Sequence, residues 1–204
     1  MATQRVFIIA TGVANIASMK GAFHRLGCET VLTEDPDSVQ KESLVVLPGV
    51  GAFAAGIERL RALGLVEVIQ ERCRSGRPLL AVCLGLQLLF RSSEESAGVE
   101  GLSVFNDAVS RFDTSLRIPQ LGWNSVEAPS FAQYLESGHF YFANSFCVRK
   151  VDGASAVASS HYGHPFVAAF ERAGLLACQF HPELSGVAGA SLLGRWVNNS
   201  IKKF

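Results

Sequence analysis

The sequence predicts an α/β fold: a central, mostly parallel sheet with helices on both faces, to which mixed or antiparallel strands are added. Two observations predict it. In the first half of the chain, short continuous apolar runs alternate with segments of helical periodicity, as in consecutive βαβ units. In the second half, shorter segments alternate apolar and polar residues, which is typical of antiparallel strands with one solvated face.

The first half contains four predicted strands, and right-handed crossovers should make them parallel. The predicted strands are 6–10, 29–32, 44–47 and the short apolar run that ends at Cys83. The predicted helices are 16–26, 53–63, 65–74 and a further one that begins after Cys83. Gly27 ends the first helix, and the Asp- and Pro-containing residues 34–37 are predicted to form a turn.

The pattern changes after the helix that follows Cys83. Residues 92–101 are polar and glycine-bearing, which indicates a surface loop. The shorter strands are predicted at 107–112, 124–127, 139–148, 155–162 and 166–171, and a final helix at 190–201. No linker or internal repeat divides the chain, so we predict a single domain over residues 1–204.

Composition narrows the classes of function. The chain has 204 residues, 49% of them hydrophobic, and its eighteen basic and eighteen acidic residues cancel. Without a basic run, nucleic-acid or membrane-surface binding has no electrostatic basis. No apolar stretch approaches a membrane span, and no secretory leader is evident.

The cysteines indicate a reducing compartment. Five cysteines, an odd number without CxxC spacing, predict free thiols in a cytoplasmic protein and neither a disulfide framework nor a zinc site. We expect no metal or other cofactor. The isolated histidines are expected to be surface or core residues: His24, His139, His161 and His164.

Cys83 stands at the centre of the most informative stretch. An apolar strand ends at Cys83, Gly85 follows, and a helical pattern begins, which is the sequence shape of a nucleophile elbow. The first N–H groups of a helix would favour a thiolate there. Gly85 would allow a substrate or a neighbouring strand to approach the turn. The alternative is that Cys83 is a small buried hydrophobic residue.

Two further motifs lie at the predicted carboxyl ends of strands, where ligands bind in open α/β sheets. The turn Pro48-Gly49-Val50-Gly51 could aim backbone N–H groups at an oxyanion, or it could be a plain tight turn; it lacks the Lys-Ser/Thr of a phosphate-binding loop. In His181-Pro182-Glu183, the proline favours an extended His181, which would place His181 and Glu183 on one side. The carboxylate would then orient the imidazole as a base for a thiol nucleophile.

Together these motifs resemble the class I, triad-type glutamine amidotransferases. Three further stretches resemble the glutaminase subunits of imidazole glycerol phosphate synthase within that family: residues 12–16, 119–124 and 140–146. The resemblance extends from about residue 5 to the final helix. It implies that Cys83 is the nucleophile, that His181 is the base and then the acid, and that Glu183 orients His181.

The resemblance also assigns the remaining site residues. It implies that the backbone N–H groups of Val50 and Leu84 hold the oxyanion. Residues expected to bind glutamine are Gly49, Gly51, Gln87, Asn144, Ser145 and Phe146. Residues expected at a partner interface are Asn15, Gly122, Trp123 and Asn124. For Trp123, a place in the core remains an alternative.

The family implies that ammonia from L-glutamine passes to a cyclase/synthase subunit, a (β/α)₈ barrel, in a heterodimer of histidine biosynthesis. Since few residues follow Glu183, we expect that subunit to act in trans. Three residues depart from the family pattern: Leu184, where a lysine is frequent, Ala14 and Gln120. The alternatives are a subunit of another synthase, a stand-alone Cys-His-Glu hydrolase of peptides or γ-glutamyl compounds, and a non-catalytic relative, against which the complete triad argues.

Overall fold

The computed structural model describes residues 3–12 and 15–201. The strands are β1 (Arg5–Ile9), β2 (Glu29–Thr33), β3 (Val45–Leu47), β4 (Leu79–Val82), β5 (Phe90–Ser93), β6 (Phe105–Arg111), β7 (Gln120–Val126), β8 (Gly138–Asn144), β9 (Phe146–Val148), β10 (Ala156–His161), β11 (Pro165–Arg172) and β12 (Leu175–Cys178). The helices are α1 (Ile16–Arg25), α2 (Pro36–Lys41), α3 (Phe53–Ala62), α4 (Val66–Arg74), α5 (Leu84–Leu88), η1 (Pro182–Leu184) and α6 (Gly186–Ile201).

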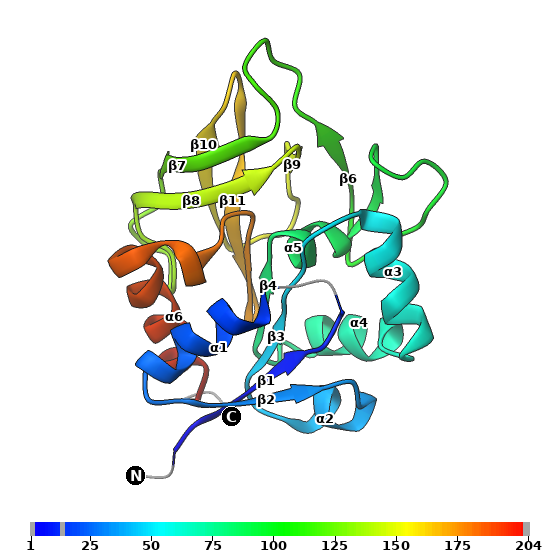
Figure 1. Cartoon of the computed structure of the whole chain (residues 1–204), viewed down its shortest axis with the longest axis vertical. Helices are drawn as coiled ribbons and strands as arrows, with labels where there is room; N and C mark the ends of the chain where they lie inside the picture. The colour runs from blue at the N-terminus through cyan, green and yellow to red at the C-terminus, as the bar shows by residue number, and fades with distance from the viewer. Residues whose placement is uncertain (1–2, 13–14, 202–204) are drawn as a thin grey trace.

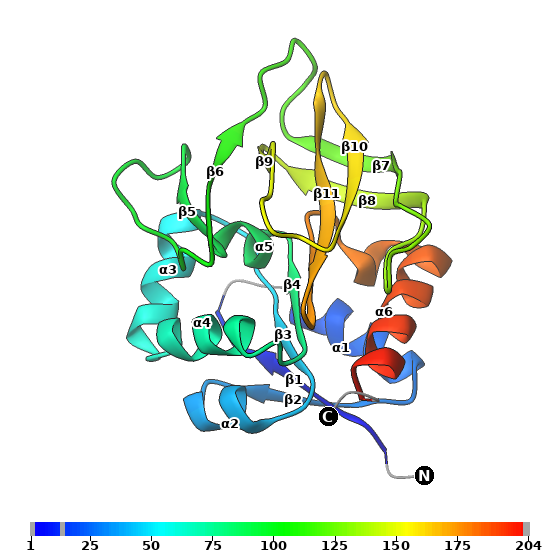
Figure 2. The ribbon, with the colours of Figure 1, turned by 180° about the vertical axis from the view of Figure 1, so that it is seen from behind.

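A ten-stranded sheet runs through the described part of the chain in the order β2-β1-β3-β4-β12-β11-β9-β6-β5, with β10 added beside β11 (Figures 1 and 2). The pairs within β2-β1-β3-β4-β12 are all parallel. β11, in contrast, pairs antiparallel with β12, β9 and β10. A separate two-stranded sheet, β7-β8, lies beside it. The predicted fold class is confirmed.

Helices cover both faces of the parallel strands, and the alternation of side chains along β1 shows why. Val6 and Ile8 belong to one core cluster, which side chains of α1 and α6 complete. Phe7 and Ile9 belong to a second cluster on the other face, with side chains of α2, α3 and α4. A strand buried on both faces needs a continuous apolar sequence, which is what residues 6–9 provide.

The segment predicted as a turn at 34–37 is instead the start of helix α2. Asp35 caps the helix, because its carboxylate accepts hydrogen bonds from the backbone N–H groups of Asp37 (3.3 Å) and Ser38 (3.0 Å). Pro36 occupies the first helical turn. The Asp-Pro pair that suggests a turn is also a helix start signal, since proline is compatible with the first turn and Asp is a favoured cap.

Other predicted boundaries also need correction. The helix after Cys83 has only five residues, and β5 begins at Phe90, so the polar stretch at 92–101 is a strand at its start and a loop only afterwards. The strand predicted at 139–148 is divided between β8 and β9 at Ser145. The final helix begins at Gly186, four residues before the predicted start at 190. Within the turn predicted at 11–15, Val13 and Ala14 lie outside the described residues.

No helix among the described residues is long and apolar enough to cross a lipid bilayer.

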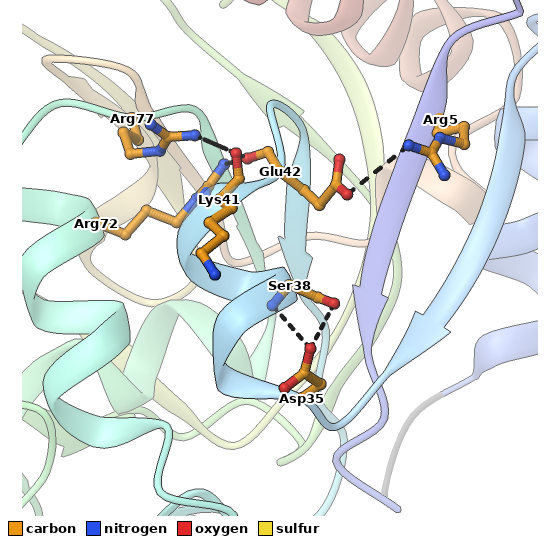
Figure 3. A network of polar contacts seen from close by, with 7 residues as sticks. All are labelled: Arg5, Asp35, Ser38, Lys41, Glu42, Arg72 and Arg77. Atoms are coloured by element: carbon orange, nitrogen blue, oxygen red, sulfur yellow. Dashed lines mark hydrogen bonds and ion pairs between the residues drawn. The ribbon is translucent and has the colours of Figure 1, made fainter.

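Arg72, on α4, bonds to the end of α2 and to the segment before β4. Figure 3 shows its side chain beside Lys41 and Glu42. Its guanidinium is 1% exposed and donates hydrogen bonds to the carbonyl oxygens of Val39 (2.7 Å), Glu42 (2.7 Å) and Pro78 (2.9 and 2.7 Å). Burial lowers the pKa of Arg72 to about 9, so the group remains charged at neutral pH. A cation at the carboxyl end of α2 also complements the helix dipole.

We predict that Arg72→Gln lowers the free energy of unfolding by about 3 kcal/mol or more. The substitution leaves several buried carbonyl groups without a donor, and each costs about 1–3 kcal/mol. Urea unfolding measures the change. Arg74→Gln on the same helix is the matched control: Arg74 forms an exposed ion pair with Glu71, and its loss should cost less than about 1 kcal/mol. Equal effects would contradict the role given to Arg72.

Candidate active site

Cys83 occupies a strained turn between β4 and α5. Its φ of 55° and ψ of −109° are unusual for a residue with a side chain. Its backbone N–H donates to the carbonyl of Cys178 in β12 at 2.7 Å, and its own carbonyl accepts from the N–H of Gln87 at 3.2 Å. The predicted elbow is therefore present. The side chain is 6% exposed and lines a pocket.

Gly85 allows α5 to lie directly against the end of β3. An ideal Cβ at Gly85 would be 2.0 Å from the carbonyl oxygen of Leu47, a distance that no side chain could accept. Gly49, two residues beyond Leu47, also lies against the elbow, because a Cβ there would be 2.9 Å from Cβ of Leu84. The two glycines thus place the turn 48–51 beside Cys83.

His181 and Glu183 come from the segment after β12. His181 is extended, with φ −98° and ψ 95°, as the following proline predicts. The extended geometry expected through Glu183 is wrong, because Pro182–Leu184 forms the 3₁₀ helix η1. The 3₁₀ turn still brings Glu183 back to its neighbour: Nδ1 of His181 lies 2.8 Å from Oε1 of Glu183, and both side chains are buried.

Hydrogen bonds to neighbouring strands hold His181 in place. Its backbone N–H donates to the carbonyl of Tyr141 in β8 at 2.9 Å. The hydroxyl of Ser185 donates to the carbonyl of His181 at 2.6 Å and accepts from the N–H of Tyr141 at 3.0 Å. His181 is therefore anchored both to the residue that follows η1 and to the two-stranded sheet.

Electrostatics favour the protonated imidazole. Burial by itself lowers the pKa of His181, but hydrogen bonds to Cys83 and Glu183, together with the negative charge that both groups can carry, raise that pKa to about 10. Cys83 and His181 also line the same pocket. A protonated imidazole is a suitable neighbour for a nucleophilic sulfur, since a positive charge stabilises the thiolate that attacks.

The other cysteines have no such environment. Burial raises the pKa of Cys73 to about 12 and that of Cys147 to about 11. Burial also raises the pKa of Cys178 and, more weakly, that of Cys28. These thiols stay protonated at neutral pH, so their reactivity is low.

The Cys83 pocket has a volume of about 240 Å³, smaller than the roughly 300–1,000 Å³ of sites for drug-sized ligands and suited to an amino acid. Cys83 and His181 line it. Of the other residues predicted for the site, those that line the pocket are Val50, Gly51, Leu84, Gln87, Asn144, Ser145 and Phe146. Gly49 packs behind Leu84, and Glu183 pairs with His181.

One predicted oxyanion donor is occupied. The backbone N–H of Leu84 donates to the carbonyl of Gly49 at 3.2 Å. In this conformation, Leu84 cannot also donate to a substrate oxygen in the way that the sequence predicts. Val50 lies in the turn next to that carbonyl, lines the pocket and is 38% exposed. Rotation of the Gly49–Val50 peptide would break the bond and free the Leu84 donor.

Two residues of the site have no role in the sequence-based prediction. Glu95 lines the pocket, and its Oε2 accepts from the N–H of Phe53 at 2.6 Å, so the segment expected to be a surface loop is anchored to the start of α3. Gln179 is fully buried, and its Nε2 lies 3.7 Å from Sγ of Cys83. Its position between the end of β12 and His181 is the signal that could have found it.

The residues predicted for a partner interface lie outside the pocket. Trp123 is 58% exposed, so the alternative of a core tryptophan is wrong; its ring contacts Tyr141 edge-on at a centroid distance of 6.3 Å. Gly122, beside it, has a φ of 130°. Asn124 donates to the carbonyl of His161 at 2.9 Å. Asn15 caps α1, accepting from the N–H of Ser18 at 3.3 Å.

Two of the departures from the family pattern can be located. Gln120 is 3% exposed, and neither its Nε2 nor its Oε1 has a hydrogen-bond partner among the described residues. Leu184 is 37% exposed and follows Glu183 directly in η1. The third departure, Ala14, lies outside the described residues.

Comparison with known proteins identifies the family. The family model of class-I glutamine amidotransferases matches residues 10–197. The chain belongs to the class-I glutamine amidotransferase family. It is 41% identical over 206 residues to the Thermobifida fusca imidazole glycerol phosphate synthase subunit HisH, and the match covers 95% of this chain and 97% of that protein.

Two further comparisons extend this result. The chain is 36% identical over 203 residues to the chloroplastic imidazole glycerol phosphate synthase hisHF of Arabidopsis thaliana, with 96% of this chain and 34% of that longer protein covered. A crystal structure of a glutamine amidotransferase superposes with a TM-score of 0.76 at 20% identity, covering 96% of this chain and 98% of the other. At that identity, the superposition supports the fold.

We predict that Glu183→Gln moves the alkaline limb of glutamine hydrolysis to lower pH. Glu183 raises the pKa of His181 by a hydrogen bond and by its charge, so its neutral replacement lowers that pKa. In the unmodified protein, kcat/KM should fall as the pH rises through about 10, and in the variant it should fall earlier.

The measurement is kcat/KM for glutamate release across the alkaline range. Glu136→Gln is the control, because Glu136 carries an exposed carboxylate that is paired with Arg195; its profile should coincide with that of the unmodified protein. An alkaline limb that stays in place in Glu183→Gln would show that Glu183 does not act on His181.

Proposed function

We propose that the chain is the glutaminase subunit of an imidazole glycerol phosphate synthase and that it supplies ammonia from L-glutamine for histidine biosynthesis. The observation that carries the proposal is that Cys83 and the hydrogen-bonded pair His181–Glu183 lie together at an amino-acid-sized pocket. Similarity to imidazole glycerol phosphate synthase HisH subunits, at 34% and 41% identity over nearly the whole chain, supports the assignment. In this proposal, residues 1–204 form one domain that needs no cofactor. A cytoplasmic location is part of the proposal, because free cysteines are typical of proteins in that reducing compartment.

Acylation requires a Cys83 thiolate and a protonated His181. The Cys83 thiolate attacks the side-chain amide carbon of glutamine, and the C=O π electrons move to the oxygen. Protonated His181 donates its proton to the leaving nitrogen as the C–N bond breaks. Ammonia leaves, and a γ-glutamyl thioester remains on Cys83.

Deacylation requires a neutral His181, and acylation of Cys83 favours that state. The hydrogen bond to Cys83 is the largest influence that raises the His181 pKa. Once the sulfur is a neutral thioester, that influence disappears while burial continues to lower the pKa. The neutral imidazole can then take a proton from water, which attacks the thioester and releases glutamate and the thiolate.

The polar groups of the pocket suit a free amino acid. Asn144 donates through Nδ2 to the carbonyl of Phe146 at 3.0 Å, which leaves its buried Oδ1 without a partner among the described residues. Glu95 adds a carboxylate to the pocket wall. An acceptor and an anion together can bind an α-ammonium group. Ser145 and Phe146 line the same pocket.

An apolar surface near His181 is proposed as the docking face for the cyclase subunit. Its exposed side chains are Leu121 (69%), Trp123 (58%), Leu184 (37%) and Val187 (88%). They come from β7, η1 and the start of α6, and β8 links these elements by contacts with β7, η1 and α6. Docking there would enclose ammonia before it meets bulk water. A (β/α)₈ barrel is the expected form of this partner.

The oxyanion turn offers a means of control by that partner. Free glutaminase activity would waste glutamine, and here the Leu84 N–H is bonded to Gly49. We propose that partner docking rotates the Gly49–Val50 peptide and makes both Val50 and Leu84 available. Loss of one oxyanion donor costs roughly 10²–10³ in rate, which is enough for a switch.

Two alternative functions predict a different response of glutamate release to a partner subunit. A stand-alone hydrolase of γ-glutamyl compounds would release glutamate at the same rate with and without a cyclase subunit. A subunit of another synthase would be stimulated by a different partner. The identity to HisH subunits over nearly the whole chain favours the imidazole glycerol phosphate synthase.

We predict that Cys83→Ala abolishes glutamine-dependent synthesis by the complex but preserves synthesis from added ammonium salt. Cys83 serves ammonia release alone, so the cyclase should be unaffected. Both activities are measured on one preparation of the complex. If both activities fall equally, the substitution has damaged the assembly, and if glutamine-dependent activity survives, Cys83 is not the nucleophile.

We predict that Trp123→Ala leaves the isolated fold unchanged but weakens binding of the cyclase subunit or its stimulation of glutamate release. Exposed tryptophans are frequent anchors of interfaces. Thermal unfolding, a binding titration and glutamate release are measured together. Phe131→Ala is the control, since it shortens another exposed aromatic side chain (76%) in the β7–β8 loop. Normal binding and stimulation in Trp123→Ala would remove Trp123 from the interface.

A further inference from the structure

The Cys83 sulfur has a second polar neighbour besides His181. Gln179 follows β12 directly and is fully buried. Its backbone N–H donates to the carbonyl of Ala168 at 2.8 Å, which fixes the chain at this point. Its side-chain Nε2 lies 3.7 Å from Sγ of Cys83, within the range for a hydrogen bond to sulfur.

A backbone carbonyl determines which end of the Gln179 amide faces the sulfur. The carbonyl of Phe146 can only accept, so Gln87 must direct its NH₂ group there, at 3.2 Å. The same NH₂ group lies 2.9 Å from the Gln179 side chain, which must therefore present its oxygen to Gln87. The remaining end of Gln179, its NH₂ group, is left to face Cys83.

A donor in this position stabilises a thiolate more than a thiol. A hydrogen bond to a charged acceptor is stronger than one to a neutral acceptor, and a nearly buried anion needs such donors in place of water. An amide also neither gains nor loses a proton near neutral pH, so it cannot compete with His181 for the proton that moves during the reaction.

We propose that Gln179 is a further catalytic residue, a neutral hydrogen-bond donor that holds the Cys83 thiolate and is aimed by Gln87. The proposal rests on the proposed role of Cys83 as nucleophile. It also gives Gln87 a function in addition to lining the glutamine pocket, because Gln87 connects the Phe146 end of that pocket to the sulfur. The thiolate then has donors from two residues of one segment, Gln179 and His181.

The test follows alkylation of Cys83 by iodoacetamide as a function of pH, on the full chain without glutamine or partner. Mass spectrometry of the Cys83 peptide separates its reaction from that of the four other cysteines. Gln179→Met removes the donor at similar volume, and Gln179→Glu keeps the shape but places a carboxylate beside the sulfur. Gln70→Met is the control: Gln70 is on α4, donates to the carbonyl of Leu102 at 2.8 Å and does not line the Cys83 pocket.

Both Gln179 variants should shift the midpoint of the alkylation profile to higher pH while keeping the plateau rate at high pH. The expected shift is about one pH unit or more, equivalent to a roughly tenfold slower reaction at a fixed pH below the midpoint. The control should keep the original profile. A purely structural role would lower the plateau and leave the midpoint in place.

An unchanged midpoint in both Gln179 variants, with the fold intact by circular dichroism, would overturn the proposal. So would a fall in plateau rate alone. Failure of the proposed function is recognised separately, because the unmodified protein would then not support glutamine-dependent synthesis with the cyclase subunit, whatever the alkylation profiles show.

Discussion

The close approach of α5 to the end of β3 is the contact on which the active site depends. It exists because Gly85 has no side chain where a Cβ would collide with the Leu47 carbonyl. This contact fixes the distance between the Cys83 turn and the Gly49–Gly51 turn. A bulkier residue at position 85 would have to move β3 or the elbow, and interiors packed to this density tolerate such displacement poorly.

The second constraint is electrostatic. A thiol, an imidazole and a carboxylate are all less than 10% exposed, and burying charges without partners is costly. In this site the imidazole lies between the other two groups and is the partner of both the sulfur and the carboxylate. The raised pKa of His181 follows from this mutual dependence. In the proposed mechanism, the state of the sulfur therefore decides whether His181 acts as acid or base.

The sequence predicts the parallel core, the elbow and the triad because each has a local cause. Continuous apolar runs define buried strands, and Gly85 and Pro182 restrict the backbone around Cys83 and His181. Features that depend on distant partners escaped prediction. The start of β5 at Phe90 depends on its pairing with β6, and the Leu84 amide bond depends on a carbonyl from another turn. The turn predicted around Asp35 is a helix start, because turns and helix starts favour the same residues.

The central claim is that Cys83 forms a covalent intermediate with glutamine. Hydroxylamine tests it most directly, since it reacts with a thioester to give a hydroxamate in place of glutamate. Added to the active complex during turnover, it should yield γ-glutamyl hydroxamate at the expense of glutamate, and Cys83→Ala should form neither product from glutamine. Undiminished glutamate release without hydroxamate would mean that water attacks glutamine directly, and the covalent mechanism would be wrong.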